Sequence, residues 1–211
     1  MIKLVIFDVD GTIFQVYSWQ YIHEKLGTLP QAKRHFDQFL DNQISYEEWA
    51  QQDVVLWKNQ PLGRIQKIIS QMPYTKGAVD TLTSLKQNNM EIFLLSAGLT
   101  QVAERIQKEI GINSFLANTL IAKNGCLTGE VEVNVSFYSK DRHLQEILKE
   151  FNVAVQECAA VGDDQTLVPL FRKVGLAIAF NPVNKAVEEH ADIIVKSNDL
   201  RDILPYVNTS T

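Results

Sequence analysis

Short apolar runs of β-strand character alternate along most of this chain with amphipathic segments of helical period. Parallel strands need a crossover of a dozen or more residues between them, and that crossover is usually a helix. The alternation therefore predicts an α/β protein: a Rossmann-like three-layer core with a mostly parallel sheet and helices on both faces. The runs of strand character cover residues 2–7, 91–95, 159–161, 176–180 and 193–195.

Two further segments have clear local signals. Residues 99–110 repeat apolar side chains with helical period and are followed by Gly111, the residue type that most often ends a helix. Residues 120–131 contain Asn124-Gly125 between apolar stretches, which is the strongest short hairpin signal. We expect an antiparallel flap here, at the edge of the sheet.

Residues 14–75 interrupt the alternation, because every segment in them has helical character. Ser45 and Glu48 form a capping-box pattern at the start of one segment. We expect residues 1–13 and 76–211 to form the core and residues 14–75 to form a small all-helical cap inserted after the first strand. The expected cap helices are residues 18–26, 31–40, 45–59 and 62–72.

The predicted cap is rich in large rings. It contains all three tryptophans, Trp19, Trp49 and Trp57, and 10 of the 19 aromatic residues. A small helical unit needs bulky side chains to build a core of its own. The alternative is that some of these rings line a site for an apolar ligand.

Composition excludes several classes of protein. A net charge of −5 without any Lys/Arg cluster argues against nucleic-acid binding. No apolar run approaches the roughly 20 residues of a membrane-spanning helix. Cys126 and Cys158 are too few for a disulfide framework, which favours a reducing compartment. We expect a cytoplasmic protein that binds neither nucleic acid nor membrane; its oligomeric state is left open.

The stretch "VIFDVDGTIF" places Asp8 and Asp10 directly after the first predicted strand. Side chains two apart on an extended segment point to the same side, so these carboxylates repel one another. A bound cation or a reacting group would offset that cost. The carboxyl end of a strand in an open α/β sheet is also where such folds bind their ligands.

Other polar residues are predicted to reach the same edge. Ser96 follows the strand at 91–95, Asp163 and Asp164 follow the strand at 159–161, and Lys140 precedes the helix that leads into it. Carboxylates, a hydroxyl and an ammonium group at one edge are the parts needed for Mg²⁺-assisted phosphoryl transfer.

The ordered motifs "FDVDGT", "LLSAG", "SKDRHLQEIL" and "AAVGDD" resemble the four motifs of the haloacid dehalogenase (HAD) superfamily. The layout is similar to its phosphoserine-phosphatase-like branch, which has a helical cap after the first motif. The resemblance covers nearly the whole chain. It implies an aspartyl-phosphate mechanism with Mg²⁺ as cofactor.

Carried over to this sequence, the resemblance makes Asp8 the nucleophile and Asp10 the general acid and then the general base. The other implied positions are Ser96, Ala97 and Lys140 for phosphate binding, Thr12 and Gly98 for loop support, and Asp8, Asp10 (through its backbone carbonyl) and Asp163 for Mg²⁺.

This sequence departs from the branch in two places. Thr166 and Leu167 replace the asparagine and second aspartate of the usual fourth motif, which leaves Asp164 as the nearby carboxylate able to complete a metal site. Tyr17 and Asp53 stand where the resembled enzymes use a glutamate and an arginine to grip phosphoserine. We therefore expect Tyr17 and Asp53 to set a different specificity.

These features together predict a Mg²⁺-dependent phosphatase that hydrolyses a small phosphorylated metabolite other than phosphoserine. The alternatives within the superfamily are a phosphoserine phosphatase and a phosphotransferase. A receiver-like domain or an inactive relative that only binds a phosphorylated ligand is the alternative from another class, because receivers combine an acidic cluster, a hydroxyl and a lysine on a similar sheet. The helical insert argues against a receiver.

Overall fold

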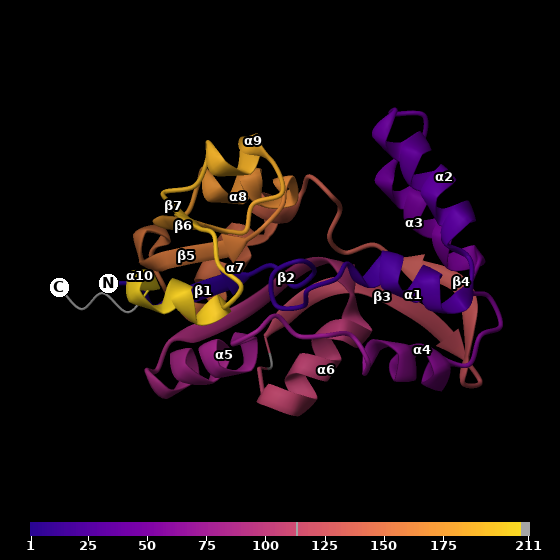
Figure 1. The fold of residues 1–211 in the computed structure, drawn as a ribbon, viewed down its shortest axis with the longest axis horizontal. Coiled ribbons are helices and arrows are strands. Elements are labelled where there is room, and N and C mark those ends of the chain that lie inside the picture. Colours follow the sequence, from indigo (N-terminus) through magenta and orange to yellow (C-terminus); the bar gives the residue numbers. More distant parts are fainter. Residues whose placement is uncertain (113, 208–211) are drawn as a thin grey trace.

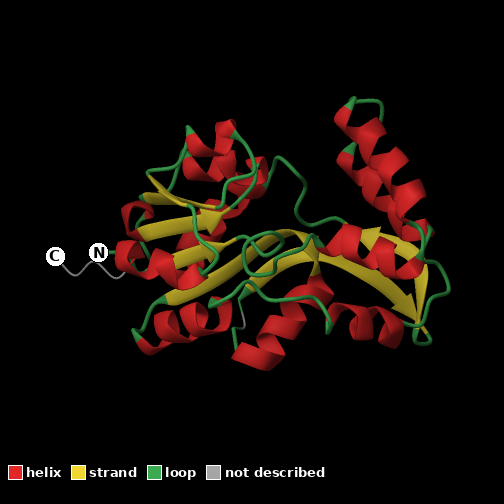
Figure 2. Ribbon diagram, in the orientation of Figure 1, coloured by secondary structure: helices red, strands yellow, loops and turns green. Residues whose placement is uncertain are grey.

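The computed structural model describes residues 1–112 and 114–207. Within these residues, seven strands form one sheet in the order β4-β3-β2-β1-β5-β6-β7, parallel except for the β3–β4 pair (Figure 2). The α/β core predicted from the sequence is confirmed. The strands are β1 Leu4–Phe7, β2 Glu91–Leu99, β3 Phe115–Lys123, β4 Cys126–Glu132, β5 Cys158–Gly162, β6 Leu176–Phe180 and β7 Ile193–Val195.

Helices cover both faces of this sheet (Figure 1). One face carries α5 Ala78–Gln87, α6 Thr100–Ile110 and α10 Leu204–Val207, and the other carries α7 Leu144–Phe151, α8 Val168–Phe171 and α9 Lys185–Glu188. Short 3₁₀ turns complete the connections: η1 Lys140–His143, η2 Val155–Glu157, η3 Gln165–Leu167 and η4 Leu200–Ile203.

The central strand β1 shows why two cores form. Its four residues are fully buried and alternate between the faces: Val5 and Phe7 pack into the cluster under α5 and α6, while Leu4 and Ile6 pack into the cluster under α7 and α8. A strand buried on both faces needs a continuous apolar run rather than an alternating one. The N-terminal run of the sequence meets that requirement.

The predicted hairpin is present at the sheet edge. Asn124 and Gly125 both have positive φ, 53° and 79°, as a tight turn of the type I′ class requires. One strand is longer than expected: β2 runs to Leu99 because it pairs with β3 again at Asn118, after an irregularity in its register past Leu95. That irregularity frees residues 96–98 from regular pairing with β3.

Helices alone form the segment between β1 and α5 over most of its length, as expected for the cap. The structure gives α1 Ser18–Leu26, α2 Leu29–Leu40, α3 Tyr46–Val55 and α4 Leu62–Ile69. Ser45 and Glu48 form the predicted capping box at the start of α3. The third and fourth helices end sooner than the sequence predicted; after α3 the chain turns through Asn59, which has a φ of 65°.

The cap is attached to the β3–β4 hairpin by backbone hydrogen bonds. Asn59 N–H donates to the Leu127 carbonyl, Leu127 N–H donates to the Gln60 carbonyl, and Leu62 N–H donates to the Gly125 carbonyl. In Figure 1 the long strand β3 runs between α1, which lies above it in this view, and α4, which lies below it, and α2 and α3 rise from that end of the sheet. Among the described residues, every helix is too short or too polar to cross a lipid bilayer.

Candidate active site

The carboxyl ends of β1, β2 and β5 carry the polar residues predicted from the sequence. Asp8 directly follows β1, Ser96 lies in the irregular part of β2, and Asp163 directly follows β5. These strands are neighbours in the sheet. The side chains therefore meet at one edge, where the connections to the cap and to α8 diverge in opposite directions.

Asp8 forms a buried ion pair with Lys140. Lys140 Nζ lies 2.6 Å from Asp8 Oδ2, and the exposed fractions of the two residues are 1% and 3%. The other oxygen, Oδ1, accepts a 2.7 Å hydrogen bond from Val9 N–H. Burial raises the pKa of Asp8, Lys140 opposes the rise, and the nearby Asp164 adds to it. Lys140 is thus the counter-charge that favours the ionised form of this carboxylate.

One oxygen of the Asp10 carboxyl group is hydrogen-bonded to the first residue of α1. Its Oδ2 accepts from both the backbone N–H and the hydroxyl of Ser18, at 3.0 and 2.5 Å, where α1 begins. Its Oδ1 is buried and has no hydrogen-bond partner among the described residues. Burial raises the pKa of Asp10 to about 7, although the Ser18 hydrogen bonds oppose that rise. A carboxyl group with this pKa can donate and accept a proton near neutral pH.

The Ser96–Gly98 segment lies against both aspartates and the cap. Gly98 N–H donates to Ser96 Oγ at 2.9 Å, which leaves the Ser96 hydroxyl proton free to bind another group. A Cβ atom at Gly98 would lie 2.7 Å from Asp10 Oδ2, so only glycine fits. The carbonyl of Ala97 accepts three hydrogen bonds, from Trp19, Tyr46 and Asn118. Two cap side chains thus help to position this loop.

Asp163 is fixed by two hydroxyl donors. Thr12 Oγ1 donates to Oδ1 at 2.9 Å, and the Tyr17 phenol donates to Oδ2 at 2.6 Å. Burial raises the pKa of Asp163 to about 8, and repulsion from Asp8 and Asp164 adds to the shift. The hydrogen bond from Thr12, the residue expected to support the loop, joins the segment after β1 to the segment after β5. Tyr17 adds a contact that sequence reasoning did not foresee.

Two residues of the fourth motif, Asp164 and Thr166, are hydrogen-bonded to one another. Asp164 Oδ1 accepts from both the backbone N–H and the hydroxyl of Thr166, at 2.9 and 2.5 Å. The same hydroxyl lies 3.4 Å from Asp8 Oδ2. Leu167 is fully buried in the core cluster under α7 and α8 and packs against Gly162. Thr166 thus faces Asp8, whereas Leu167 is a core residue.

The oxygens at this edge fit Mg²⁺. Asp8 and Asp163 are buried and repel one another, a cost that a divalent cation would offset. Among the described residues, no three acidic, histidine or cysteine side chains already surround a single metal position. Mg²⁺ does not require such a cage, because it is usually bound by one or two carboxylates and keeps several waters or phosphate oxygens.

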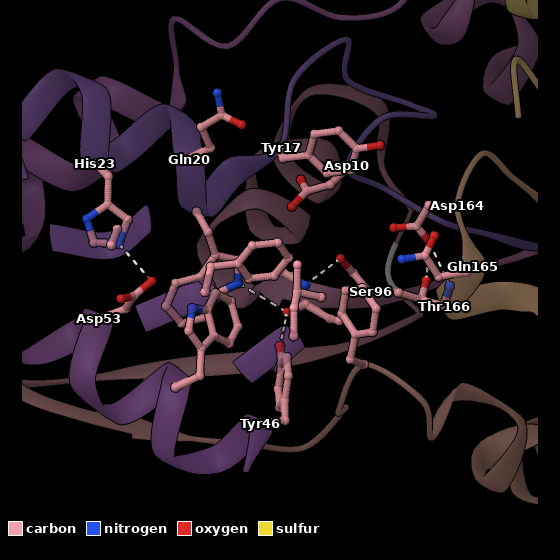
Figure 3. Close-up of a pocket in the computed structure, with 18 of the residues that line it drawn as sticks. Asp10, Tyr17, Gln20, His23, Tyr46, Asp53, Ser96, Asp164, Gln165 and Thr166 are labelled. Atoms are coloured by element: carbon pink, nitrogen blue, oxygen red, sulfur yellow. Dashed lines mark hydrogen bonds and ion pairs between the residues drawn. The ribbon is translucent and has the colours of Figure 1, made fainter. Parts of the chain in front are cut away.

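A cavity of about 700 Å³ opens from this edge into the space below α2 and α3. Figure 3 shows Asp164 and Thr166 at one end of it, Ser96 near the middle, and His23 with Asp53 at the opposite end. Other lining residues are mostly apolar or aromatic, including Trp19, Leu29, Phe36, Tyr46, Trp49, Phe137 and Val183. The cavity is large enough to hold a phosphate group together with a bulky leaving group.

Asp53 lies in the wall of this cavity, and both of its carboxylate oxygens are hydrogen-bonded to histidines of the cap. His23 Nε2 lies 3.2 Å from Oδ2, and His35 Nδ1 lies 2.7 Å from Oδ1. The indole N–H of Trp57 donates to His23 Nδ1, so that nitrogen is an acceptor and Nε2 carries the proton given to Asp53. Asp53 therefore links α1, α2 and α3 of the cap.

This linkage predicts a stability effect. Asp53→Asn should lower the free energy of unfolding by about 1.5–3 kcal/mol, because it removes a charge-assisted hydrogen bond between buried groups. Urea denaturation would measure the loss, and hydrogen exchange should localise it to α1–α3. Asp37→Asn, which changes an exposed acid on α2, is the matched control. Equal stability of the two variants would contradict the structural role of Asp53.

The structure thus brings together the predicted catalytic and phosphate-binding residues. Asp8 is hydrogen-bonded to Lys140 and Asp163 to Thr12, and the Asp10 carboxylate lies close beside Gly98. Sequence reasoning missed several partners of these residues. Ser18, Trp19, Tyr46, Asn118 and Thr166 contact the site from the cap, the hairpin or the fourth motif. A serine at a predicted helix start, like Ser18, carries no sequence signal beyond helix capping.

Comparisons with known proteins identify the family and several similar chains. The family model described as haloacid dehalogenase-like hydrolase matches residues 2–175. A protein named phosphoserine phosphatase from Methanocaldococcus jannaschii is 31% identical over 208 residues, covering 97% of each chain. A solved structure described as a phospho-aspartyl intermediate analogue of phosphoserine phosphatase is 30% identical, has a TM-score of 0.85, and covers 98% of this chain and 99% of its own.

A third similarity concerns the fold alone. A HAD family hydrolase from Salmonella enterica serovar Typhi superposes with a TM-score of 0.90 at 18% identity, over 99% of this chain and 72% of its own. The chain belongs to the haloacid dehalogenase-like hydrolase family. Within that superfamily it is a phosphatase of the phosphoserine-phosphatase-like branch. The receiver-like alternative is therefore wrong.

Proposed function

We propose that this phosphatase hydrolyses a small phosphomonoester, with Mg²⁺, through an aspartyl-phosphate on Asp8. The observation that carries the proposal is that two buried carboxyl groups at one edge have different partners: Asp8 is paired with Lys140, whereas Asp10 has an oxygen without a partner among the described residues and a pKa raised by burial to about 7. Such a pair provides a nucleophile and a general acid at one edge. The intermediate analogue of the 30% identical relative supports this assignment.

The chain's own residues account for the main steps. Asp8 attacks the phosphorus atom and displaces the leaving oxygen, which takes a proton from Asp10. Lys140, the Ser96 hydroxyl and the Thr166 hydroxyl lie where they can hold phosphoryl oxygens while this happens. Asp10, now ionised, then accepts a proton from the water that attacks the phosphorus and releases Asp8.

Asp8, Asp163 and the backbone carbonyl of Asp10 would hold the Mg²⁺. When bound, the ion supplies positive charge that reduces repulsion between the carboxylates and the phosphate. Asp164 is the further candidate ligand, and its present bonds to Thr166 would have to rearrange for it to contact a metal.

Phosphoserine is not the substrate we propose. Recognition of its ammonium and carboxylate groups requires fixed opposite charges, and Tyr17 and Asp53 provide a phenol and an already bonded acid in those positions. The relatives' names give no support to this exclusion, because they are named phosphoserine phosphatases. Phosphoserine hydrolysis and phosphoryl transfer to another acceptor are therefore the alternatives to be assayed beside it.

Metal removal tests the proposal directly. Phosphate release from p-nitrophenyl phosphate should fall by about two powers of ten or more when EDTA is added, and it should return with excess Mg²⁺. Circular dichroism with and without EDTA provides the control that the fold is retained. Unchanged turnover in the chelated protein would contradict the metal-dependent mechanism. Absence of turnover with any phosphate ester would favour the inactive-relative hypothesis.

A cytoplasmic location is still an expectation from composition.

A further inference from the structure

The cavity wall beside the Ser96–Gly98 segment is a continuous aromatic surface. We define this aromatic wall as Trp19, Phe36, Tyr46, Trp49 and Phe137, all of which line the cavity. Ring centroids lie 4.9 Å apart for Trp19 and Trp49, 5.1 Å for Tyr46 and Trp49, and 5.8 Å for Phe36 and Trp49. Phe137 completes the wall from the core side, 6.5 Å from Phe36.

The wall begins at the reacting centre. Trp19 Nε1 and the Tyr46 hydroxyl both donate to the carbonyl of Ala97, next to Ser96. These hydrogen bonds occupy the polar atoms of the two rings, so the atoms left to contact a ligand are carbon atoms. A leaving group that extends from the phosphate past Trp19 and Tyr46 therefore meets the carbon atoms of these two rings.

The charged groups of the lining offer little to a charged leaving group. Asp8, Asp10, Lys140 and Asp164 belong to the reaction centre. Asp53 is bonded to two histidines. Lys33 and Asp37 lie at the outer side of the cavity, on α2, where water screens them.

We propose that the cavity selects phosphate monoesters whose alcohol is uncharged and carries a ring or a similarly bulky apolar group. The inference rests on the proposed phosphatase function and specifies its substrate class. The fully buried ring Trp57 belongs to the cap's own core, whereas Trp19 and Trp49 contribute to the cavity wall, so the aromatic residues of the cap serve both purposes. A three-carbon amino acid would leave most of the cavity unfilled.

The decisive comparison uses three phosphate esters of primary alcohols. Benzyl phosphate and ethyl phosphate have leaving groups of similar acidity and differ mainly in the ring, while phosphoserine adds two charges. We expect kcat/KM for benzyl phosphate to exceed that for ethyl phosphate by about a hundredfold, since burying a ring contributes more than the single methylene that pockets commonly distinguish. Phosphoserine should be no better than ethyl phosphate.

Two phenylalanines of α2 give a matched pair of variants. Phe36 is half-buried and faces the cavity, whereas Phe39 is buried and does not line it. Phe36→Ala should lower the benzyl-to-ethyl ratio of kcat/KM about tenfold. Phe39→Ala should lower stability but keep the ratio. Equal loss of the ratio in both variants would show that cap stability, not the wall, sets selectivity.

Binding of phosphonates tests the proposed substrate class separately from the proposed phosphatase function. Benzylphosphonate and ethylphosphonate cannot be hydrolysed, and quenching of tryptophan fluorescence would report their binding without turnover. Tighter binding of benzylphosphonate supports the aromatic site even if no ester is hydrolysed, in which case only the proposed function fails. Turnover with equal efficiency for benzyl and ethyl phosphate, and equal binding of the phosphonates, would overturn the substrate class and leave the phosphatase function intact. Phosphoserine as the best substrate, with that preference lost in Lys33→Ala, would likewise overturn it.

Discussion

Asp8→Asn should fold normally and release phosphate at least about 10⁴-fold more slowly than the unmodified protein. An amide cannot form the acyl-phosphate bond, so the covalent route is closed rather than slowed. Phosphate release from p-nitrophenyl phosphate at saturating Mg²⁺ provides the measurement. When the Asp8→Asn variant is incubated with the ester and quenched rapidly in acid, mass spectrometry should also detect no phosphorylated protein.

Stability is the second part of this prediction. Loss of the Asp8 charge leaves Lys140 buried without its partner, which alone would be destabilising. However, burial and the nearby Asp164 already raise the pKa of Asp8, so the carboxylate itself is held at a cost. We expect these effects to offset one another, with a small change in the free energy of unfolding. Asp141→Asn, at a surface ion pair with Lys173, is the control for an Asp-to-Asn change. Activity within tenfold of this control would contradict the nucleophilic role of Asp8.

Much of the fold could be predicted because its signals are local. Strand β1 is an apolar run bounded by Asp8, and the β3–β4 turn is specified by Asn124-Gly125, whose positive φ values few other residues tolerate. The extension of β2 to Leu99 could not be predicted, because it depends on renewed pairing with Asn118 in a neighbouring strand. Pairing of that kind is a tertiary effect with no periodic signal.

The site divides in the same way. Asp8, Asp10 and Asp163 follow strands, so their convergence can be inferred from the parallel sheet alone. The partners of Tyr17 and Asp53 could not be inferred, because each comes from a different element. Tyr17 contacts Asp163 across 146 positions, and Asp53 contacts His23 and His35 on two other helices. A substitution in a motif shows which charge is lost, but only the structure shows what the new side chain contacts.

Under the two proposals, reaction class and substrate choice are determined by different parts of the chain. The core provides Asp8, Asp10 and Lys140, to which we assign the proposed chemistry, whereas α1–α3 provide most of the aromatic wall. The two parts are joined where Trp19 and Tyr46 donate to Ala97. A cap that positions the phosphate loop while it contacts the leaving group can couple substrate fit to catalysis.

Asp10→Asn should produce a loss of rate that depends on the leaving group. Asp10 Oδ1, which has no hydrogen-bond partner in the described part of the chain, and the pKa of about 7 suit Asp10 to protonate the leaving oxygen, a contribution typically worth about 10²–10⁴-fold. Ethyl phosphate, whose alkoxide is a poor leaving group, should lose about 10³-fold in the first chemical step. The leaving group of p-nitrophenyl phosphate needs little protonation, so the rate of that step should be largely retained for this ester.

The second step gives this prediction its sharpest readout. Without the Asp10 carboxylate to activate water, the aspartyl-phosphate should accumulate, so p-nitrophenyl phosphate should give a burst of p-nitrophenol equal to the enzyme concentration, followed by slow turnover. Ser18→Ala is the matched control, because it removes one hydrogen bond to Oδ2 but keeps the carboxyl group. The control should show no burst and the same dependence on leaving group as the unmodified protein. Equal loss of rate for ethyl and p-nitrophenyl phosphate in Asp10→Asn, without a burst, would show that Asp10 is not the general acid.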